Sequence, residues 1–474
     1  MDSKKIFSGI KWATLQTIID IAFRFGIKFI LIKLLLPEQF GLIGMCSIFI
    51  VIAGAAGELG MSAALIQKKN ENEVVPMYST AFWTGIMWGW VVFLIMALVI
   101  GPFASYFYSE PKLIYLIPVL SLSILFRPLG LIHTVILTRK LNFKSLAKIS
   151  NISAIIAGLL ALILAFFGGG VWALVLNMAL APVISLPLLY LNVGWKPKWE
   201  WKKEYFNNIF GFGAFSSTTQ ILSMIMYNVD NLVIGKVFGA TKLGYYTLAF
   251  SLTEQIRQTI SAVLNKVMFP VFGNVQDKKE VIKGYFLKII KLNAMVIFPY
   301  LGFLIVFATD VVNFFGPEWG EAIIPLQILA LATMVHITVN SFASILRGIG
   351  HPKIEMKIIL FTSVLVFLPS LLIGVYYFGI IGAASAVLFN KIALVILGLA
   401  TLRKYIDVSI HDVFRAVFST IFIVLGSMAI VFCSNLYLPE FSTLLKIPLY
   451  FTLCFGGIIY SEKSILFSLT KHFA

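Results

Sequence analysis

The sequence predicts an all-α, polytopic membrane protein with about 14 transmembrane helices, arranged as two pseudo-symmetric six-helix bundles followed by two extra C-terminal helices. Composition, a regular succession of apolar stretches and an internal repeat predict this fold. Of the 474 residues, 59% are hydrophobic and only 12% are charged. Soluble domains carry about 25% charged residues. We therefore expect most of the chain to lie in a bilayer.

Apolar stretches long enough to cross a bilayer follow one another along the whole chain. A spanning helix needs about 20 largely apolar residues. Short turns separate most stretches, and the pairs that meet at Gly168–Gly170 and Phe378–Gly379 have almost no loop. The expected spans cover about residues 10–36, 40–66, 77–104, 113–138, 146–167, 170–192, 206–236, 242–268, 284–313, 321–346, 355–377, 380–402, 411–433 and 444–465.

Basic residues in the connections predict which side of the membrane each connection faces. Lysine and arginine concentrate at both termini and in every second loop, and they are scarce in the loops between. Cytoplasmic loops carry this excess, so both termini are expected in the cytoplasm. The net charge of +16 is then mostly a topology signal and does not indicate nucleic-acid binding. The basic, tryptophan-rich stretch WKPKWEWKKEYF (195–206) suits a segment that lies on anionic lipid headgroups.

An internal repeat divides the chain near its centre. Residues 33–43, KLLLPEQFGLI, align without a gap with residues 236–246, KVFGATKLGYY, and weaker matches recur further along in the same order. Because each copy holds an even number of helices, both have the same orientation, and two such bundles leave a cleft between them. We expect one bundle at residues 1–200, a second at 201–405, and two additional helices at 406–474.

Charged residues inside the apolar spans are the candidate binding residues. Asp20, Arg24 and Lys28 follow one another at intervals of four, so they share one helix face. A charge at the bilayer centre costs about 2.5–3.5 kcal/mol even on lenient scales, so this face must meet a hydrated cavity or partner groups. The bases that lie centrally in spans of both halves favour an anionic substrate. They are Arg24, Lys28, Arg127, Arg257 and Lys391.

Four stretches resemble one known family. They are LLLPEQFGLIGM (34–45), ELGMSAALIQKK (58–69), NVDNLVIGKVFGATKLGYYTLAFSL (228–252) and RGIGHPK (347–353). They resemble the polysaccharide transporters, Wzx-like flippases of lipid-linked oligosaccharides in the multidrug/oligosaccharidyl-lipid/polysaccharide exporter superfamily. The resemblance covers nearly the whole chain, and the PEQFG turn is specific in combination with LGYYTLA.

The resemblance implies a substrate and a mechanism. A polyprenyl diphosphate carrying an oligosaccharide repeat unit would cross from the cytoplasmic to the outer leaflet of a bacterial inner membrane, for assembly of O-antigen, capsule, exopolysaccharide or teichuronic acid. It also implies alternating access and a cationic central cleft, onto which Arg24, Lys28 and Arg257 map. The expected partners are this lipid, the surrounding membrane lipids, glycosyltransferases and a polysaccharide polymerase.

The superfamily resemblance further implies coupling to protons or sodium ions. Candidate carriers are Asp20, Glu58, Asp230 and Glu254. Asp20 with Arg24, and Glu254 with Arg257, can equally be structural ion pairs, and both interpretations stay open. No cofactor, metal site or catalytic residue is expected, because the sequence shows no nucleophile–base constellation and no phosphate-binding glycine loop.

Three other functions compete with this interpretation. A lipid II flippase is related and also cationic. A cation-coupled multidrug exporter of the same superfamily typically has twelve helices and an acidic, aromatic site. A membrane-embedded polysaccharide polymerase or ligase needs a large outer loop for its chemistry, and every loop expected outside is short.

Overall fold

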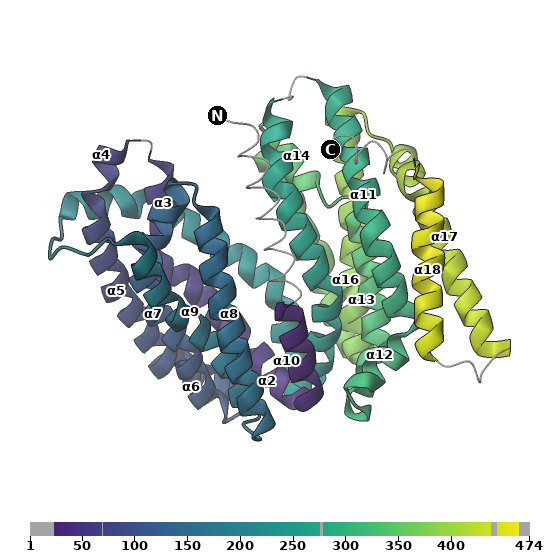
Figure 1. Ribbon diagram of the computed structural model, residues 1–474, viewed down its shortest axis with the longest axis horizontal. Helices are drawn as coiled ribbons and strands as arrows, with labels where there is room; N and C mark the ends of the chain where they lie inside the picture. The colour runs from purple at the N-terminus through teal and green to yellow at the C-terminus, as the bar shows by residue number, and fades with distance from the viewer. Residues whose placement is uncertain (1–22, 69, 275–277, 438–442, 464–474) are drawn as a thin grey trace. The chain divides into compact units, whose positions relative to one another are not determined.

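The computed structural model describes residues 23–68, 70–274, 278–437 and 443–463, and the regular structure in these residues is entirely helical (Figure 1). After a helical stretch at residues 23–34, the elements are α2 (Pro37–Glu58), α3 (Met61–Gln67), α4 (Glu71–Val74), α5 (Met77–Ile95), η1 (Met96–Ile100), α6 (Gly101–Tyr108), α7 (Leu113–Arg139), α8 (Phe143–Phe166), α9 (Val171–Val193), α10 (Lys203–Asn274), α11 (Lys279–Val306), α12 (Ala308–Phe315), η2 (Pro317–Ala322), α13 (Ile323–Ile337), α14 (Phe342–Gly348), α15 (Pro352–Phe361), η3 (Thr362–Phe367), α16 (Leu368–Ile406), α17 (Ile410–Tyr437) and α18 (Thr443–Ser461).

Nine helical runs in the described part of the chain are long and apolar enough to cross a membrane. The expected all-α membrane fold is therefore confirmed. Most of the expected first span lies at residues 1–22, outside the described residues. Two pairs of expected spans form continuous helical elements, one pair in α10 and the other in the run Pro352–Ile406.

Glycines make the tight reversals that separate these paired spans. Gly239 (φ 78°, ψ −174°) interrupts α10, and Gly379 (φ 62°, ψ −140°) interrupts α16. Gly170 precedes α9 with φ 54° and ψ −132°, nearly the geometry of Gly379. Only glycine adopts such positive φ values without steric cost. The nearly loopless turns expected at Gly168–Gly170 and Phe378–Gly379 are therefore confirmed.

One expected span is broken. Residues 40–66 were expected as a single helix, but α2 ends at Glu58 and α3 starts at Met61. Leu59 (φ 46°) and Gly60 (φ 63°) both adopt left-handed conformations, which end a helix. Arg139 binds the carbonyl groups at the C-terminal end of α3. Its Nη1 donates to the backbone oxygens of Leu65 (2.8 Å) and Lys68 (2.6 Å).

Prolines account for two wide turns inside long helices. The π-helical turns η1 and η3 lie immediately before the segments that carry Pro102 and Pro369. A proline inside a helix lacks an N–H group, and its ring clashes with the carbonyl four residues earlier. A π turn accommodates this clash without ending the helix.

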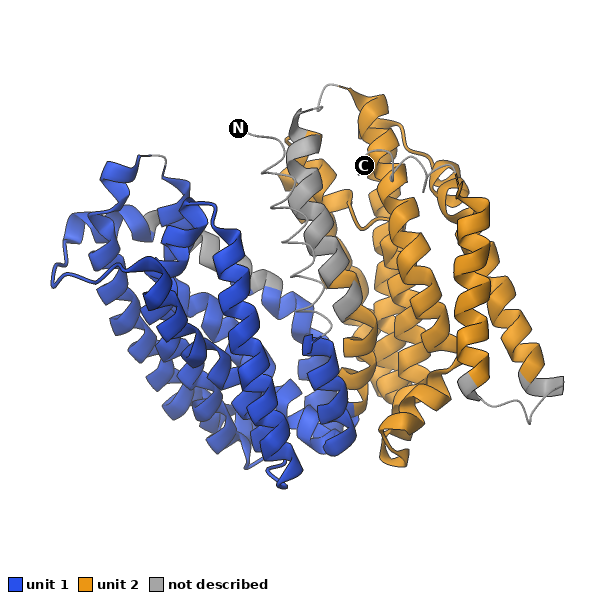
Figure 2. Ribbon diagram, viewed as in Figure 1, with its two compact units in different colours: residues 1–244 blue, residues 245–474 orange. Residues whose placement is uncertain are grey.

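The chain forms two compact units, residues 1–244 and 245–474, coloured separately in Figure 2. In unit 1, a core around Leu65, Phe82 and Ile132 joins α3, α5 and α7. Each unit is a set of residues that contact one another more than they contact the rest of the chain. The division of the sequence into bundles at residues 200 and 405 stays a prediction.

In unit 2, the two C-terminal helices are held against α11. The Tyr450 hydroxyl of α18 donates to the carbonyl oxygen of Pro299 (3.0 Å), and Gly302 leaves the room that this ring occupies. Lys291 of α11 forms an ion pair with Glu462 (2.6 Å), which also accepts a hydrogen bond from Ser419 of α17 (2.6 Å). The extra helices are thus an integral part of this unit.

Candidate functional site

The charged residues expected in the spans fall into groups within each unit. In unit 1, Arg24 is exposed and its Nη2 donates to Ser150 Oγ of α8 (3.1 Å). Ile27 packs tightly against Gly158 of the same helix, and Lys28 is partly buried one turn beyond Arg24. The described part of the first span, residues 23–34, therefore contacts α8 and carries both bases. Asp20 lies outside the described residues.

Arg127 occupies the middle of α7, and its guanidinium lies against α2. A Cβ atom added at Gly54 would be 3.1 Å from Arg127 Nη1, so glycine at this position makes room for the charge. The following residue, Pro128, packs against Gly85 and Gly89 of α5 and fixes this part of α7. Arg127 is exposed, and among the described residues it takes part in no ion pair.

Glu58 follows Gly54 by one helical turn on the same face of α2. It is partly buried and is the last residue of α2 before the left-handed break at Leu59 and Gly60. Within the described chain Glu58 has no ion-pair partner. Its carboxyl group therefore lies beside a potential hinge, near the face on which Arg127 lies.

Asp230 is a buried residue of α10 in unit 1. Its relative exposure is 4%, and its Oδ1 accepts a hydrogen bond from the backbone N–H of Asn231 (2.9 Å).

In unit 2, charged and polar groups from three helices meet in one cluster. Glu254 and Arg257 of α10 form an ion pair (Nε–Oε2, 2.6 Å) with relative exposures of only 4% and 8%. The Arg257 Nη1 donates to Asn340 Oδ1 (3.2 Å), and Asn340 lies in the break between α13 and α14. Broken membrane helices typically line binding sites.

His336 and Lys391 complete this group. His336 lies in the last turn of α13 and interacts electrostatically with Lys391 of α16 and with Arg257. The His336 Nδ1 atom is buried without a hydrogen-bond partner. We call Glu254, Arg257, His336, Asn340 and Lys391 the polar cluster of unit 2. It contains two basic residues, Arg257 and Lys391, and one acidic residue, Glu254.

Sequence reasoning identified the bases but missed two of their polar partners. Ser150 had no distinguishing pattern. Asn340 did carry a signal, because it follows His336 by four residues, a spacing that would put both on one face of the single helix expected at 321–346.

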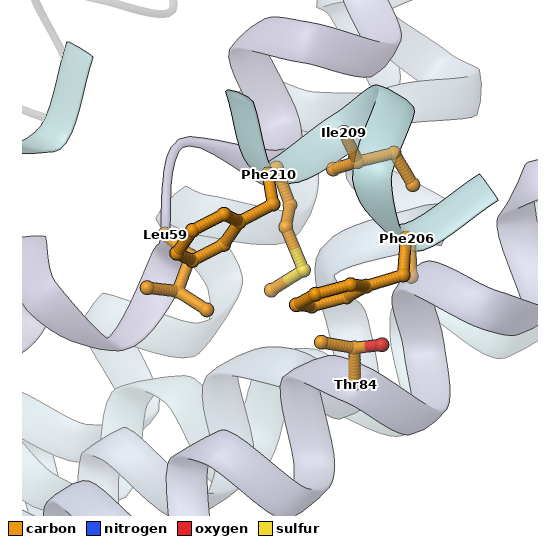
Figure 3. A pocket seen from close by; sticks show the side chains of 7 residues that line it. Leu59, Thr84, Phe206, Ile209 and Phe210 are labelled. Carbon is orange, nitrogen blue, oxygen red and sulfur yellow. The ribbon is translucent and has the colours of Figure 1, made fainter. Parts of the chain in front are cut away.

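The pocket in Figure 3 lies elsewhere in unit 1, between the α2–α3 break and the first turns of α10. It is lined by Leu59, Met61, Ala81, Thr84, Phe206, Ile209 and Phe210. None of these side chains is charged, so the pocket is unsuited to a diphosphate.

A reciprocal backbone contact joins the two repeated turns. A Cβ atom at Gly41 would overlap the carbonyl oxygen of Ala240, and one at Gly244 would overlap the carbonyl oxygen of Pro37. The repeat that places Lys33 on Lys236 also places Pro37 on Ala240 and Gly41 on Gly244. The two contacts are therefore equivalent under the repeat, and each requires a glycine.

A sequence comparison identifies the family. Residues 30–324, more than half of the chain, match the family described as polysaccharide biosynthesis protein. The chain belongs to this polysaccharide biosynthesis protein family. The resemblance found in the sequence to Wzx-like polysaccharide transporters is thereby confirmed.

Named members of this family are similar over most of their length. The teichuronic acid biosynthesis protein TuaB of Bacillus subtilis is 28% identical over 74% of this chain and 72% of its own. The lipopolysaccharide biosynthesis protein WzxC of Escherichia coli is 24% identical over 85% of this chain and 81% of its own. The succinoglycan biosynthesis transport protein ExoT of Rhizobium meliloti is 25% identical over 74% and 71%.

Solved structures share the fold of this polysaccharide biosynthesis protein. The lipid II flippase MurJ in an inward closed conformation has a TM-score of 0.74 at 15% identity, covering 96% of this chain and 99% of its own. An inward-facing multidrug resistance MATE family transporter of the MOP superfamily has a TM-score of 0.65 at 17% identity, covering 82% of this chain and 94% of its own. The protein is therefore a multi-pass membrane protein of the polysaccharide biosynthesis protein family, and it shares the fold of these transporters.

Proposed function

We propose that this protein is a flippase that moves polyprenyl-diphosphate-linked oligosaccharide repeat units from the cytoplasmic to the outer leaflet. One observation carries the proposal. Arg127 lies mid-way along an apolar span, and no ion pair within the described chain neutralises it. An unpaired charge in a span is costly unless a ligand or water meets it. Guanidinium binds phosphate oxygens in a bidentate manner.

The other bases fall into two groups in the proposal. Arg24 and Lys28 supply further positive charge in unit 1, and Arg257 and Lys391 supply it in unit 2. Each group replaces water that stabilises the diphosphate in the cytoplasm. The polyprenyl tail stays in the bilayer while the head crosses, so no covalent step is needed.

Alternating access requires contacts that form in one state and break in the other. The reciprocal contacts of Gly41 with Ala240 and of Gly244 with Pro37 have the geometry of such a closure. We expect both termini in the cytoplasm, which places these turns at the outer side. Gly244→Val would then hold the turns apart and abolish transport, whereas the matched change Gly456→Val, at a site with open space, would leave it unchanged.

The proposal also assigns the acidic residue that carries the coupling ion, H+ or Na+. Of the three acidic candidates that the structure describes, Glu58 is the best placed, because it is partly buried, has no ion-pair partner in the described chain and adjoins the α2–α3 break. Glu254 is engaged with Arg257, and Asp230 is bound by its own backbone neighbour. Coupling of Glu58 to H+ or Na+ predicts that Glu58→Gln abolishes ion-driven uptake into proteoliposomes.

Surface glycan assembly in cells tests the proposed function. A deletion strain should accumulate the lipid-linked repeat unit on the inner leaflet and lose its surface glycan. The wild-type chain and Arg403→Ala, which removes an exposed arginine at the end of α16, should restore the glycan. Arg127→Ala should insert into the membrane without restoring it. Normal glycan in the Arg127→Ala strain would remove the site assignment.

A lipid II flippase is the second candidate, favoured by the shared fold with MurJ. The two functions differ in the lipid that accumulates in the deletion strain. Accumulation of a peptidoglycan precursor in place of a surface-glycan unit would favour this alternative. For the first function, the proposed partners are glycosyltransferases and a polysaccharide polymerase.

A further inference from the structure

The connection between α9 and α10 runs along the outside of α5. We call residues 194–202 the interfacial segment. At Lys198 its backbone is held on both sides, because the Lys198 N–H donates to Ser79 Oγ (3.1 Å) and its carbonyl oxygen accepts from Trp83 Nε1 (2.8 Å). A connection of this length between helices normally has few such anchors.

A second pair of hydrogen bonds fixes the end of the segment. Trp201 Nε1 donates to Thr84 Oγ1 (3.0 Å), and the Lys202 N–H donates to Thr80 Oγ1 (3.2 Å). The two threonines, like Ser79 and Trp83, belong to the first two turns of α5. Four polar contacts therefore attach the segment to one short stretch of helix.

Aromatic rings complete the attachment. Trp199 stacks on Trp83 with ring centroids 4.2 Å apart. Trp195 packs edge-on against Tyr78 (6.1 Å) and Phe82 (5.7 Å). The segment is thus a preformed surface, and binding a partner there requires little ordering.

This surface presents indole rings and ammonium groups together. Trp199 remains 89% exposed although it stacks, and Trp201 is 47% exposed. The exposed lysines are Lys196, Lys198, Lys202 and Lys203, and in the described chain none of them is in an ion pair. Two exposed glutamates, Glu200 and Glu204, leave an excess of positive charge.

The ends of two apolar spans indicate at which level of the membrane this surface lies. The candidate span Val171–Val193 ends immediately before the segment, and the candidate span that begins at Met77 holds all four α5 anchors within its first eight residues. The segment therefore lies where hydrocarbon gives way to headgroups. Tryptophan concentrates at this level, and lysines there bind anionic headgroups.

We propose that the interfacial segment binds the headgroups of anionic phospholipids in the leaflet that it faces. The phosphate oxygens of the lipid headgroups pair with the lysines. The Trp199 ring enters the bilayer at the level of the lipid ester carbonyl groups, beside these phosphates. An acidic protein partner would use the lysines, but it would not account for two exposed indoles at the level where spans end. Because α10 begins at Lys203, such binding attaches the start of α10 to the membrane surface.

Lipid affinity of the full chain tests the proposal. The variant replaces Lys196, Lys198, Lys202 and Lys203 with Gln. The matched control replaces four exposed lysines at or near the starts of α11 and α15, where no tryptophan is adjacent in the sequence, with Gln; they are Lys278, Lys279, Lys353 and Lys357. Native mass spectrometry of the detergent-solubilised protein measures binding of dioctanoyl phosphatidylglycerol and of dioctanoyl phosphatidylcholine. Each lysine near an anionic surface contributes about fivefold in affinity.

We expect phosphatidylglycerol affinity to fall at least about tenfold in the segment variant and less than about twofold in the control. In nanodiscs, amide hydrogen exchange over 195–206 should be slower with phosphatidylglycerol than with phosphatidylcholine alone. Trp199→Ala should lose this protection while it keeps the wild-type melting temperature. Equal affinities of the two lysine variants, or equal exchange in both lipids, would overturn the proposal. So would unchanged lipid binding together with loss of a bound acidic protein.

Discussion

Arg127 of unit 1 and Arg257 of unit 2 are both central arginines in membrane helices, but their surroundings differ. Arg257 is 8% exposed, pairs with Glu254 and donates to Asn340. Arg127 is exposed, rests on Gly54 and takes part in no ion pair within the described chain. A buried pair loses much stability when one member is removed. The comparison therefore separates an arginine needed for the fold from one free to meet a ligand.

The largest effect is expected from breaking the buried pair. Glu254→Ala leaves the Arg257 charge buried and should lower the free energy of unfolding by about 3–5 kcal/mol. Thermal unfolding in one detergent measures the difference. Arg127→Ala should change the same quantity by less than about 1 kcal/mol, because it removes an exposed side chain. Equal destabilisation by both changes would abolish the distinction.

Asn340 should have an intermediate effect. Asn340→Ala removes the neutral acceptor of Arg257 Nη1, and a hydrogen bond to a charged group contributes about 1.5–3 kcal/mol. The same unfolding assay measures it. Asn340→Asp provides the comparison, because a carboxylate keeps the acceptor. If the alanine variant is as stable as the aspartate variant, Asn340 does not hold Arg257.

Gly54 should affect transport more than stability. Gly54→Leu places a side chain where the Arg127 guanidinium lies, so the charge must move while the helix remains intact. We expect surface glycan to fall towards the level of Arg127→Ala, with a loss of unfolding free energy of about 1–3 kcal/mol, because leucine overpacks this buried position. Gly456→Leu, with nothing within 4 Å of its Cβ position, is the control. Full transport by Gly54→Leu would show that the position of Arg127 is unimportant.

The smallest effect is expected at the exposed pair of Lys112 with Glu38 (2.7 Å). The hydrogen bond to Glu38 raises the pKa of Lys112 above its usual value. The ion pair therefore stabilises the folded protein fully below the ordinary lysine pKa. This stabilisation is lost as the pH rises through the raised pKa of Lys112 in the folded protein. Because both side chains are solvated, Lys112→Met should cost less than about 0.5 kcal/mol at pH 7. A cost similar to that of Glu254→Ala would show that burial does not distinguish the two pairs.

The sequence was sufficient for the helices and for the glycine reversals at Gly170 and Gly379, because apolar length and φ requirements are local properties. It did not predict the break at Leu59, where a left-handed leucine follows an otherwise continuous apolar pattern. It located Arg127 and Arg257 in spans but could not tell them apart. Their difference depends on Gly54 and Asn340, which are distant in sequence, and periodicity within one helix does not report such pairs.

Affinity for a polyprenyl diphosphate tests the central claim most directly. Equilibrium binding to the purified full chain would compare wild type, Arg127→Ala, the paired change Glu254→Gln with Arg257→Gln, and Arg403→Ala. The loss of one charged hydrogen-bonding group corresponds to about 10-fold to 100-fold in affinity. The account predicts a loss of this size for Arg127→Ala, a smaller loss for the paired change, because Glu254 already neutralises Arg257, and none for Arg403→Ala. Wild-type affinity in Arg127→Ala would contradict it.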